Sequence, residues 1–171
     1  MTGDTALIAT PSQTVGPFFH HGLVPHADPM ADRFPGGERI RLLVRVTDGD
    51  SQPVSDALVE VWQRGVFGRM PTREDGTCEF ETVRPGTIPD ERVESQAPHI
   101  SVCLFARGLL RQLHTRIYFA GDPALAEDAA LGTVPEERRG TLLASPDPTR
   151  PGHWVFDVHL QGERETVFFD V

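Results

Sequence analysis

Among the less common side chains that could do chemistry, the chain has seven histidines, two cysteines and a single tyrosine, Tyr118, and it has no lysine. The absence of lysine excludes a Schiff base, a Ser-Lys dyad and a Walker phosphate loop. A metal site needs ligands that converge on one point, and no H-x-H pair on a strand meets this need. No G-x-S-x-G elbow supports a serine nucleophile. Residue chemistry alone therefore predicts no self-sufficient catalytic site among the histidines, which are His20, His21, His26, His99, His114, His153 and His159.

Length and charge narrow the class of protein. A chain of 171 residues fits one domain with a sizeable core. Its formal net charge of −9 argues against a nucleic-acid surface, which needs clustered cations. No apolar run is long enough for a membrane span, and no targeting segment is recognisable. We expect a cytoplasmic protein in which Cys78 and Cys103 are buried free thiols.

The elements that must position any site are mostly strands. Residues 1–37 are expected to form an irregular arm, because prolines and glycines between residues 10 and 37 favour neither a helix nor an inner strand. Residues 38–171 are expected to form an all-β sandwich, with one or two short helices within 123–131 and 135–144. Apolar alternation, β-branched residues and turn signals predict strands at 40–46, 57–62, 78–83, 99–105, 112–119, 154–160 and 166–169.

Five segments of the sequence stand out from an ordinary sandwich. They are the arm segment T-P-S-Q-T-V-G-P-F-F at 10–19, V-E-V-W-Q at 59–63, A-P-H-I-S-V-C-L-F-A-R-G at 97–108, T-R-I-Y-F at 115–119 and L-Q-G-E-R-E-T-V-F-F-D at 160–170. In combination they closely resemble the intradiol ring-cleavage dioxygenases. Some members of that family are assembled from two different kinds of chain, and the segments resemble more narrowly the one of these two chains that binds no metal. The resemblance runs from about Thr10 to the C-terminus, and it implies the β-sandwich of that family.

The resemblance also implies what this chain lacks. Catalytic chains of the family hold a non-haem Fe(III) with two tyrosines and two histidines, the histidines in an H-x-H pattern. Here that pattern reads His99-Ile100-Ser101, and the tyrosine of a P-G-x-Y-P turn is Ile88. The loop that carries the other tyrosine is shortened between Trp62 and Asp75, and Tyr118 lies elsewhere in the pattern. His99 alone would not hold ferric iron, so we expect neither metal ligands nor catalytic residues in this chain.

The implied function is that of an alpha subunit whose homologous beta subunit carries the Fe(III). Such alpha–beta protomers, assembled into a larger oligomer, would cleave protocatechuate with O₂ between its hydroxyl-bearing carbons. The resemblance places four substrate-binding positions in this chain: Thr14, Gly16 and Pro17 in the arm, and Arg107 in L-F-A-R-G. Apolar residues of the arm and of the C-terminal segment, namely Phe18, Phe19, Leu23, Val24, Val167, Phe168 and Phe169, are candidates to pack against the partner.

Each of these positions has a physical rationale and an alternative. Arg107 is a permanent cation suited to an aromatic acid, or it forms an ion pair with a carboxylate of this acidic chain. Thr14 offers a hydroxyl, and Gly16 with Pro17 lets backbone pass close to a ligand, or this stretch is a buried turn at the interface. For the whole chain, the alternatives are a transthyretin-like binding module and, less favoured because the iron ligands are missing, a self-sufficient dioxygenase.

Overall fold

The computed structural model describes residues 9–16, 18–23, 30–63, 65–86 and 96–171. In the described part of the chain, no helix is long and apolar enough to cross a membrane. The elements in chain order are α1 (Phe19–Leu23), η1 (Met30–Arg33), β1 (Arg39–Thr47), β2 (Leu58–Gln63), β3 (Val66–Pro71), β4 (Thr77–Val83), β5 (His99–Phe105), β6 (Leu113–Phe119), η2 (Pro123–Glu127), α2 (Ala129–Gly132), α3 (Glu136–Arg139), η3 (Gly140–Leu142), β7 (Leu143–Pro146) and β8 (His153–His159).

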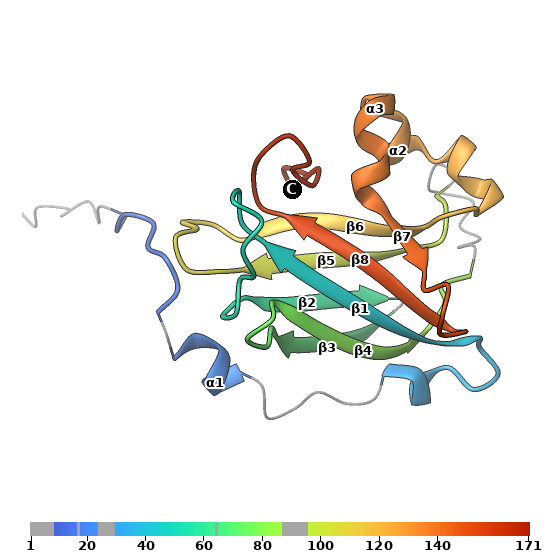
Figure 1. Ribbon diagram of the computed structural model, residues 1–171, viewed down its shortest axis with the longest axis horizontal. Helices are drawn as coiled ribbons and strands as arrows, with labels where there is room; N and C mark the ends of the chain where they lie inside the picture. The colour runs from blue at the N-terminus through green and yellow to red at the C-terminus, as the bar shows by residue number, and fades with distance from the viewer. Residues whose placement is uncertain (1–8, 17, 24–29, 64, 87–95) are drawn as a thin grey trace, which may run out of the picture.

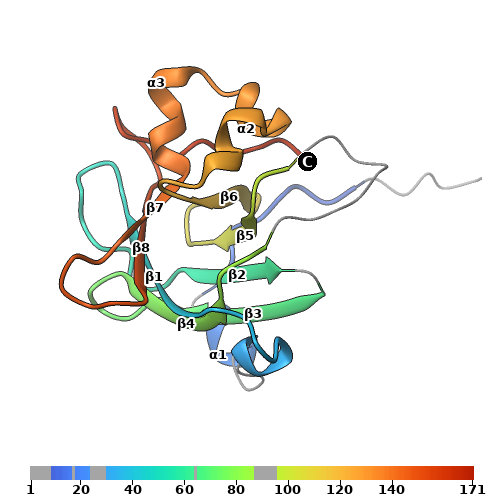
Figure 2. The ribbon, with the colours of Figure 1, turned by 90° about the vertical axis from the view of Figure 1, so that its right-hand side faces the viewer.

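The strands form the predicted all-β sandwich. Their order is β3-β2-β5-β6-β7-β8-β1-β4. The short parallel pairing of β6 with β7 connects the strands of one layer to those of the other. Figures 1 and 2 show the two layers, with β4, β1 and β8 in one and β2, β5 and β6 in the other, and with α2 and α3 gathered at one end near β6 and β7. The shared core lies between these layers.

Side-chain alternation explains which face of each strand is buried. In β1, Ile40, Leu42, Val44 and Val46 point into the core and are at most 2% exposed. The predicted alternation of β8 is confirmed, because Trp154, Phe156 and Val158 are buried while their neighbours are not. Cys78 and Cys103 are both buried free thiols, as expected.

Two predicted elements are wrong at the C-terminal end of the domain. The helix expected up to residue 144 ends early, because Leu143–Pro146 forms β7 between β6 and β8. The strand expected at 166–169 is only an isolated bridge, in which the Phe169 N–H donates to the His114 carbonyl at 2.8 Å. At 143–146, pairing with β6 and β8 decided the local conformation, whereas at 166–169 a single bridge leaves the segment without a strand.

Two further departures lie near the arm. The segment between Trp62 and Asp75 contains an unpredicted edge strand, β3, which pairs along β2. The arm contains a short helix, α1, where none was expected. Its first turn follows the Gly16 carbonyl, which accepts from Phe19 N–H at 3.1 Å, and the Phe19 ring packs 5.3 Å from that of Phe105. The stretch 18–23 has no proline, so tertiary packing can hold one helical turn there.

Candidate functional site

The arm motif and the L-F-A-R-G motif meet in space. Thr14 lies in the arm and Gly108 follows β5, and the Gly108 N–H donates to Thr14 Oγ1 at 2.8 Å. Gly108 has a φ of +90°, a left-handed conformation that glycine adopts without strain. This hydrogen bond joins two segments that are 94 residues apart in the sequence. Two of the motifs singled out from the sequence therefore belong to one place in the fold.

Arg107 lies beside this junction and pairs with Asp56. The Arg107 Nε–H donates to Asp56 Oδ2, so the ion pair weighed as an alternative role for this arginine exists in the structure. The Arg107 side chain is nevertheless 62% exposed, while that of Asp56 is 20% exposed. Among the described residues, Asp56 is the only partner of Arg107. No described residue accepts a hydrogen bond from the two terminal guanidinium nitrogens, so their donors are open to a further group.

Gly16 lies at the surface, next to the start of α1. A Cβ atom placed on Gly16 would have no atom within 4 Å, so nothing in the described part of this chain requires glycine there through close approach. Pro17, the fourth predicted position, lies outside the described residues.

The arm is attached to its own domain at further points. Phe19 contacts Phe105, and Arg69 Nη1 donates to the Leu23 carbonyl at 3.3 Å. A hollow of about 220 Å³ remains between the arm and the segment after β5, lined by Gln13, Val15, Phe19, Phe105, Ala106, Leu109, Leu110, Arg111 and Gln112. Phe18 is not part of this packing, since it is 80% exposed. The arm thus presents an apolar side chain outward while its inner side is held in place.

The position corresponding to the family's H-x-H pattern does not fit ferric iron. His99 and Ser101 lie on the same face of β5, but the Nδ1 of His99 is 2.9 Å from the Ala97 carbonyl, and burial lowers the pKa of His99. Ile88 lies outside the described residues. In the described part of the chain, no three His, Cys, Asp or Glu side chains are grouped to hold a metal ion. A neutral hydroxyl at Ser101 is a poor substitute for imidazole, so this donor set does not suit the metal.

Tyr118 is occupied by a structural role. Its side chain is fully buried, and its hydroxyl donates to Asp128 Oδ1 at 3.0 Å. Asp128 is also buried, and it accepts from Ala97 N–H at 2.8 Å and from Leu131 N–H at 2.7 Å. The carboxylate therefore caps α2 and ties the start of β5 to the end of β6. A phenol held in this way is not a free metal ligand.

The ionisation of Tyr118 provides a direct check on this arrangement. Burial raises the pKa of Tyr118 to about 12, above its ordinary value of about 10. Because the unfolded chain then releases this proton first, stability will fall as the pH rises from about 10 towards 12. Since Tyr118 is the only tyrosine, the tyrosinate absorbance of the folded chain will rise only near pH 12. A rise near pH 10 in the folded protein would show that Tyr118 is not buried.

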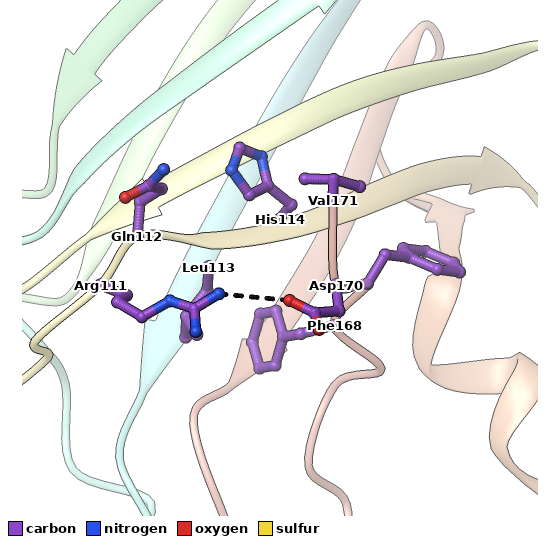
Figure 3. A pocket seen from close by; sticks show the side chains of 8 residues that line it. Arg111, Gln112, Leu113, His114, Phe168, Asp170 and Val171 are labelled. Carbon is purple, nitrogen blue, oxygen red and sulfur yellow. Dashed lines mark hydrogen bonds and ion pairs between the residues drawn. The ribbon is translucent and has the colours of Figure 1, made fainter.

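Another hollow lies on the C-terminal segment. Figure 3 shows this pocket of about 330 Å³, between the start of β6 and residues 168–171. Arg111 Nη2 donates to Asp170 Oδ1 at 3.2 Å across it, and both side chains are largely exposed, so the pair contributes little to stability. None of the predicted site residues lines this pocket. Phe168 and Phe169, which line it, are half-buried against this chain's own core clusters.

Sequence reasoning missed two acidic residues that the structure makes important. Asp56 precedes β2 and pairs with Arg107, and Asp128 interrupts the predicted helix at 123–131 and accepts from the Tyr118 hydroxyl. Asp128 has extended backbone angles, φ −72° and ψ 117°, which separate η2 from α2. Asp56 stands in a short polar connection, and Asp128 stands beside another acid, Glu127, in a stretch of alanines and leucines, so no sequence signal distinguishes either from the other acidic residues of the chain.

Comparisons with known proteins agree with this picture. No protein-family model matches the chain. The chain is 40% identical to a protocatechuate 3,4-dioxygenase alpha chain from Burkholderia cepacia, over 98% of this chain and 100% of that one. It is 37% identical to the alpha chain from Pseudomonas putida, over 94% and 96%. The beta chain from Burkholderia cepacia is 34% identical over 77% of this chain and 68% of that one.

Solved structures show the same fold. The dioxygenase domain of a carbohydrate-binding fusion protein from Streptomyces sp. SirexAA-E superposes with a TM-score of 0.60 at 26% identity, covering 92% of this chain and 99% of that domain. The sandwich and its relatives thus define the class of intradiol ring-cleavage dioxygenases. Within this class, the chain belongs to the family of protocatechuate 3,4-dioxygenase alpha chains.

Proposed function

We propose that this chain acts as the metal-free alpha subunit of a protocatechuate 3,4-dioxygenase, together with a homologous beta subunit that carries a non-haem Fe(III). The complex cleaves protocatechuate between its two hydroxyl-bearing carbons. Both atoms of O₂ enter the product, 3-carboxy-cis,cis-muconate, so no other oxidant or reductant is needed. The beta subunit's iron supplies the oxygen chemistry, and this chain supplies part of the substrate pocket.

The observation that carries this proposal is the hydrogen bond between Gly108 N–H and Thr14 Oγ1. It keeps the arm beside Arg107, so a hydroxyl and a permanent cation lie at one exposed junction. Protocatechuate carries a carboxylate on an aromatic ring, and an arginine whose terminal nitrogens have no partner among the described residues suits such a carboxylate. We assign substrate binding to Thr14, Gly16, Pro17 and Arg107, and we assign no catalytic residue to this chain.

The arm also supports contact with a partner. Phe18 is 80% exposed on an arm whose other side is anchored by Phe19 and Leu23. An obligate interface commonly buries more than about 2,000 Å² and is rich in apolar residues. We propose that residues 1–37 serve as the contact arm of the sandwich domain at 38–171. We place the alpha–beta assembly in the cytoplasm, which suits two buried free thiols.

Iron content and O₂ uptake test this proposal. The chain will be expressed alone and together with a beta chain, and each preparation will be assayed with protocatechuate. We expect iron, colour and O₂ uptake in the complex, and only background values for this chain alone. Stoichiometric iron with activity in the isolated chain would contradict the proposal and indicate a self-sufficient dioxygenase. A stable monomer that ignores the beta chain would indicate a binding module instead.

A further inference from the structure

We propose that Asp56 is a positioning residue that aims the guanidinium group of Arg107 at the carboxylate of the substrate. This inference rests on the proposed function and adds a residue to the same site. Arg107 is 62% exposed, and a free arginine side chain samples many rotamers in water. A carboxylate that fixes one edge of the guanidinium removes much of this freedom before the substrate binds.

The atoms used by the ion pair determine what Arg107 can still do. Asp56 accepts from Nε, which is on the side of the guanidinium group and not at its end. The end of the group carries the two terminal nitrogens, whose parallel N–H bonds form the fork that recognises a carboxylate through two hydrogen bonds. The contact with Asp56 therefore orients Arg107 and leaves the recognising edge open.

The backbone around Asp56 is fixed by hydrogen bonds. Its neighbours Val54 and Ala57 are both hydrogen-bonded to Thr72, which is only 6% exposed. Thr72 Oγ1 donates to the Val54 carbonyl at 2.7 Å, and Ala57 N–H donates to Thr72 Oγ1 at 3.0 Å. The backbone on either side of Asp56 is thereby tied to the end of β3. A side chain whose backbone is fixed in this way can hold a longer side chain in one direction.

The loop that carries Arg107 is fixed from the opposite side as well. Gly108 donates to Thr14 of the arm, so the Arg107–Gly108 loop lies between the arm and the Asp56 loop. Asp56 and Thr14 thus act on adjacent residues of one loop, Asp56 on a side chain and Thr14 on the backbone. Losing Asp56 should loosen the aim of Arg107 without removing the cation.

The test uses the co-expressed alpha–beta complex and two inhibitors that differ by one carboxylate, 4-hydroxybenzoate and phenol. We expect Asp56→Asn to raise the inhibition constant of 4-hydroxybenzoate by about 3- to 10-fold, a coupling of ordinary size for contacting residues. Phenol inhibition should change by less than about 2-fold. Asp56→Glu should restore part of the loss. Adding Asp56→Asn to Arg107→Ala should cause no further loss, because Asp56 acts through Arg107.

Asp157→Asn is the matched control, since Asp157 pairs with Arg45 at 3.3 Å on the surface of β8 and β1. It should leave both inhibition constants unchanged, and thermal unfolding will show that each complex is folded. The inference is overturned if Arg107→Ala weakens inhibition by 4-hydroxybenzoate alone, while Asp56→Asn affects inhibition by both compounds equally or by neither. In that case the proposed function still stands. If Arg107→Ala does not distinguish the inhibitors, the substrate role of Arg107 fails, and this inference fails with it.

Discussion

Replacing Arg107 with alanine in the alpha–beta complex will lower kcat/KM for protocatechuate by about 10- to 150-fold. This range corresponds to the loss of one charge-assisted hydrogen bond of about 1.5–3 kcal/mol. Asp56 accepts from Nε of Arg107, and the two terminal nitrogens have no partner among the described residues. Steady-state O₂ uptake at varied protocatechuate concentration measures the effect. Arg107→Lys should be intermediate, because lysine keeps the charge but lacks the planar fork.

Arg45→Ala is the control for this experiment. Arg45 also pairs with an aspartate at the surface, Asp157, but it lies on β1 and is not one of the predicted site residues. Its loss should leave kcat/KM unchanged within about 2-fold, since exposed ion pairs contribute little. An Arg107→Ala complex with unaltered kcat/KM would remove Arg107 from the substrate site and leave its pairing with Asp56 as its role.

Replacing Asp128 with alanine will lower the free energy of unfolding by about 3–5 kcal/mol. The substitution leaves Ala97 N–H, Leu131 N–H and the Tyr118 hydroxyl without their acceptor in the interior, and each buried unpaired donor costs about 1–3 kcal/mol. Asp128→Asn should also be harmful, because an amide offers one oxygen where the carboxylate uses both. Denaturant unfolding of the purified protein measures the change.

Glu127→Ala is the matched control, because Glu127 is adjacent to Asp128 but exposed at the end of η2. Its loss should change stability by less than about 0.5 kcal/mol. Tyr118→Phe removes a single hydrogen bond from the same cluster and should cost less than Asp128→Ala. A loss of under about 1 kcal/mol for Asp128→Ala would show that the three donors find other partners.

Elements whose own residues carry the signal were predictable from the sequence. The strand at 99–105 has the predicted bounds, and the alternation of β1 and β8 identified the buried faces within a residue of the observed ends. The cap of η2 was also predictable, because Asp122 accepts from Ala124 N–H just before Pro123. In these places, local preference and tertiary environment agree.

Elements that depend on a partner strand were not predictable. The β3 segment contains Gly68 and ends at Pro71, so its residues alone do not indicate a strand, and its pairing with β2 decides the conformation. The same applies to β7, where four residues join the two halves of the sandwich. The arm helix α1 depends on the contact between Phe19 and Phe105, far apart in the chain.

The sequence by itself determined that this chain cannot supply the family's iron ligands, because a site that needs two tyrosines cannot be built from Tyr118 alone. It also identified the two motifs that meet at the candidate site. Only the tertiary structure decided that Thr14 bonds Gly108, that Asp56 holds Arg107, and that Asp128 occupies Tyr118. Side-chain type can be read residue by residue, whereas pairing between distant residues depends on how the strands bring them together.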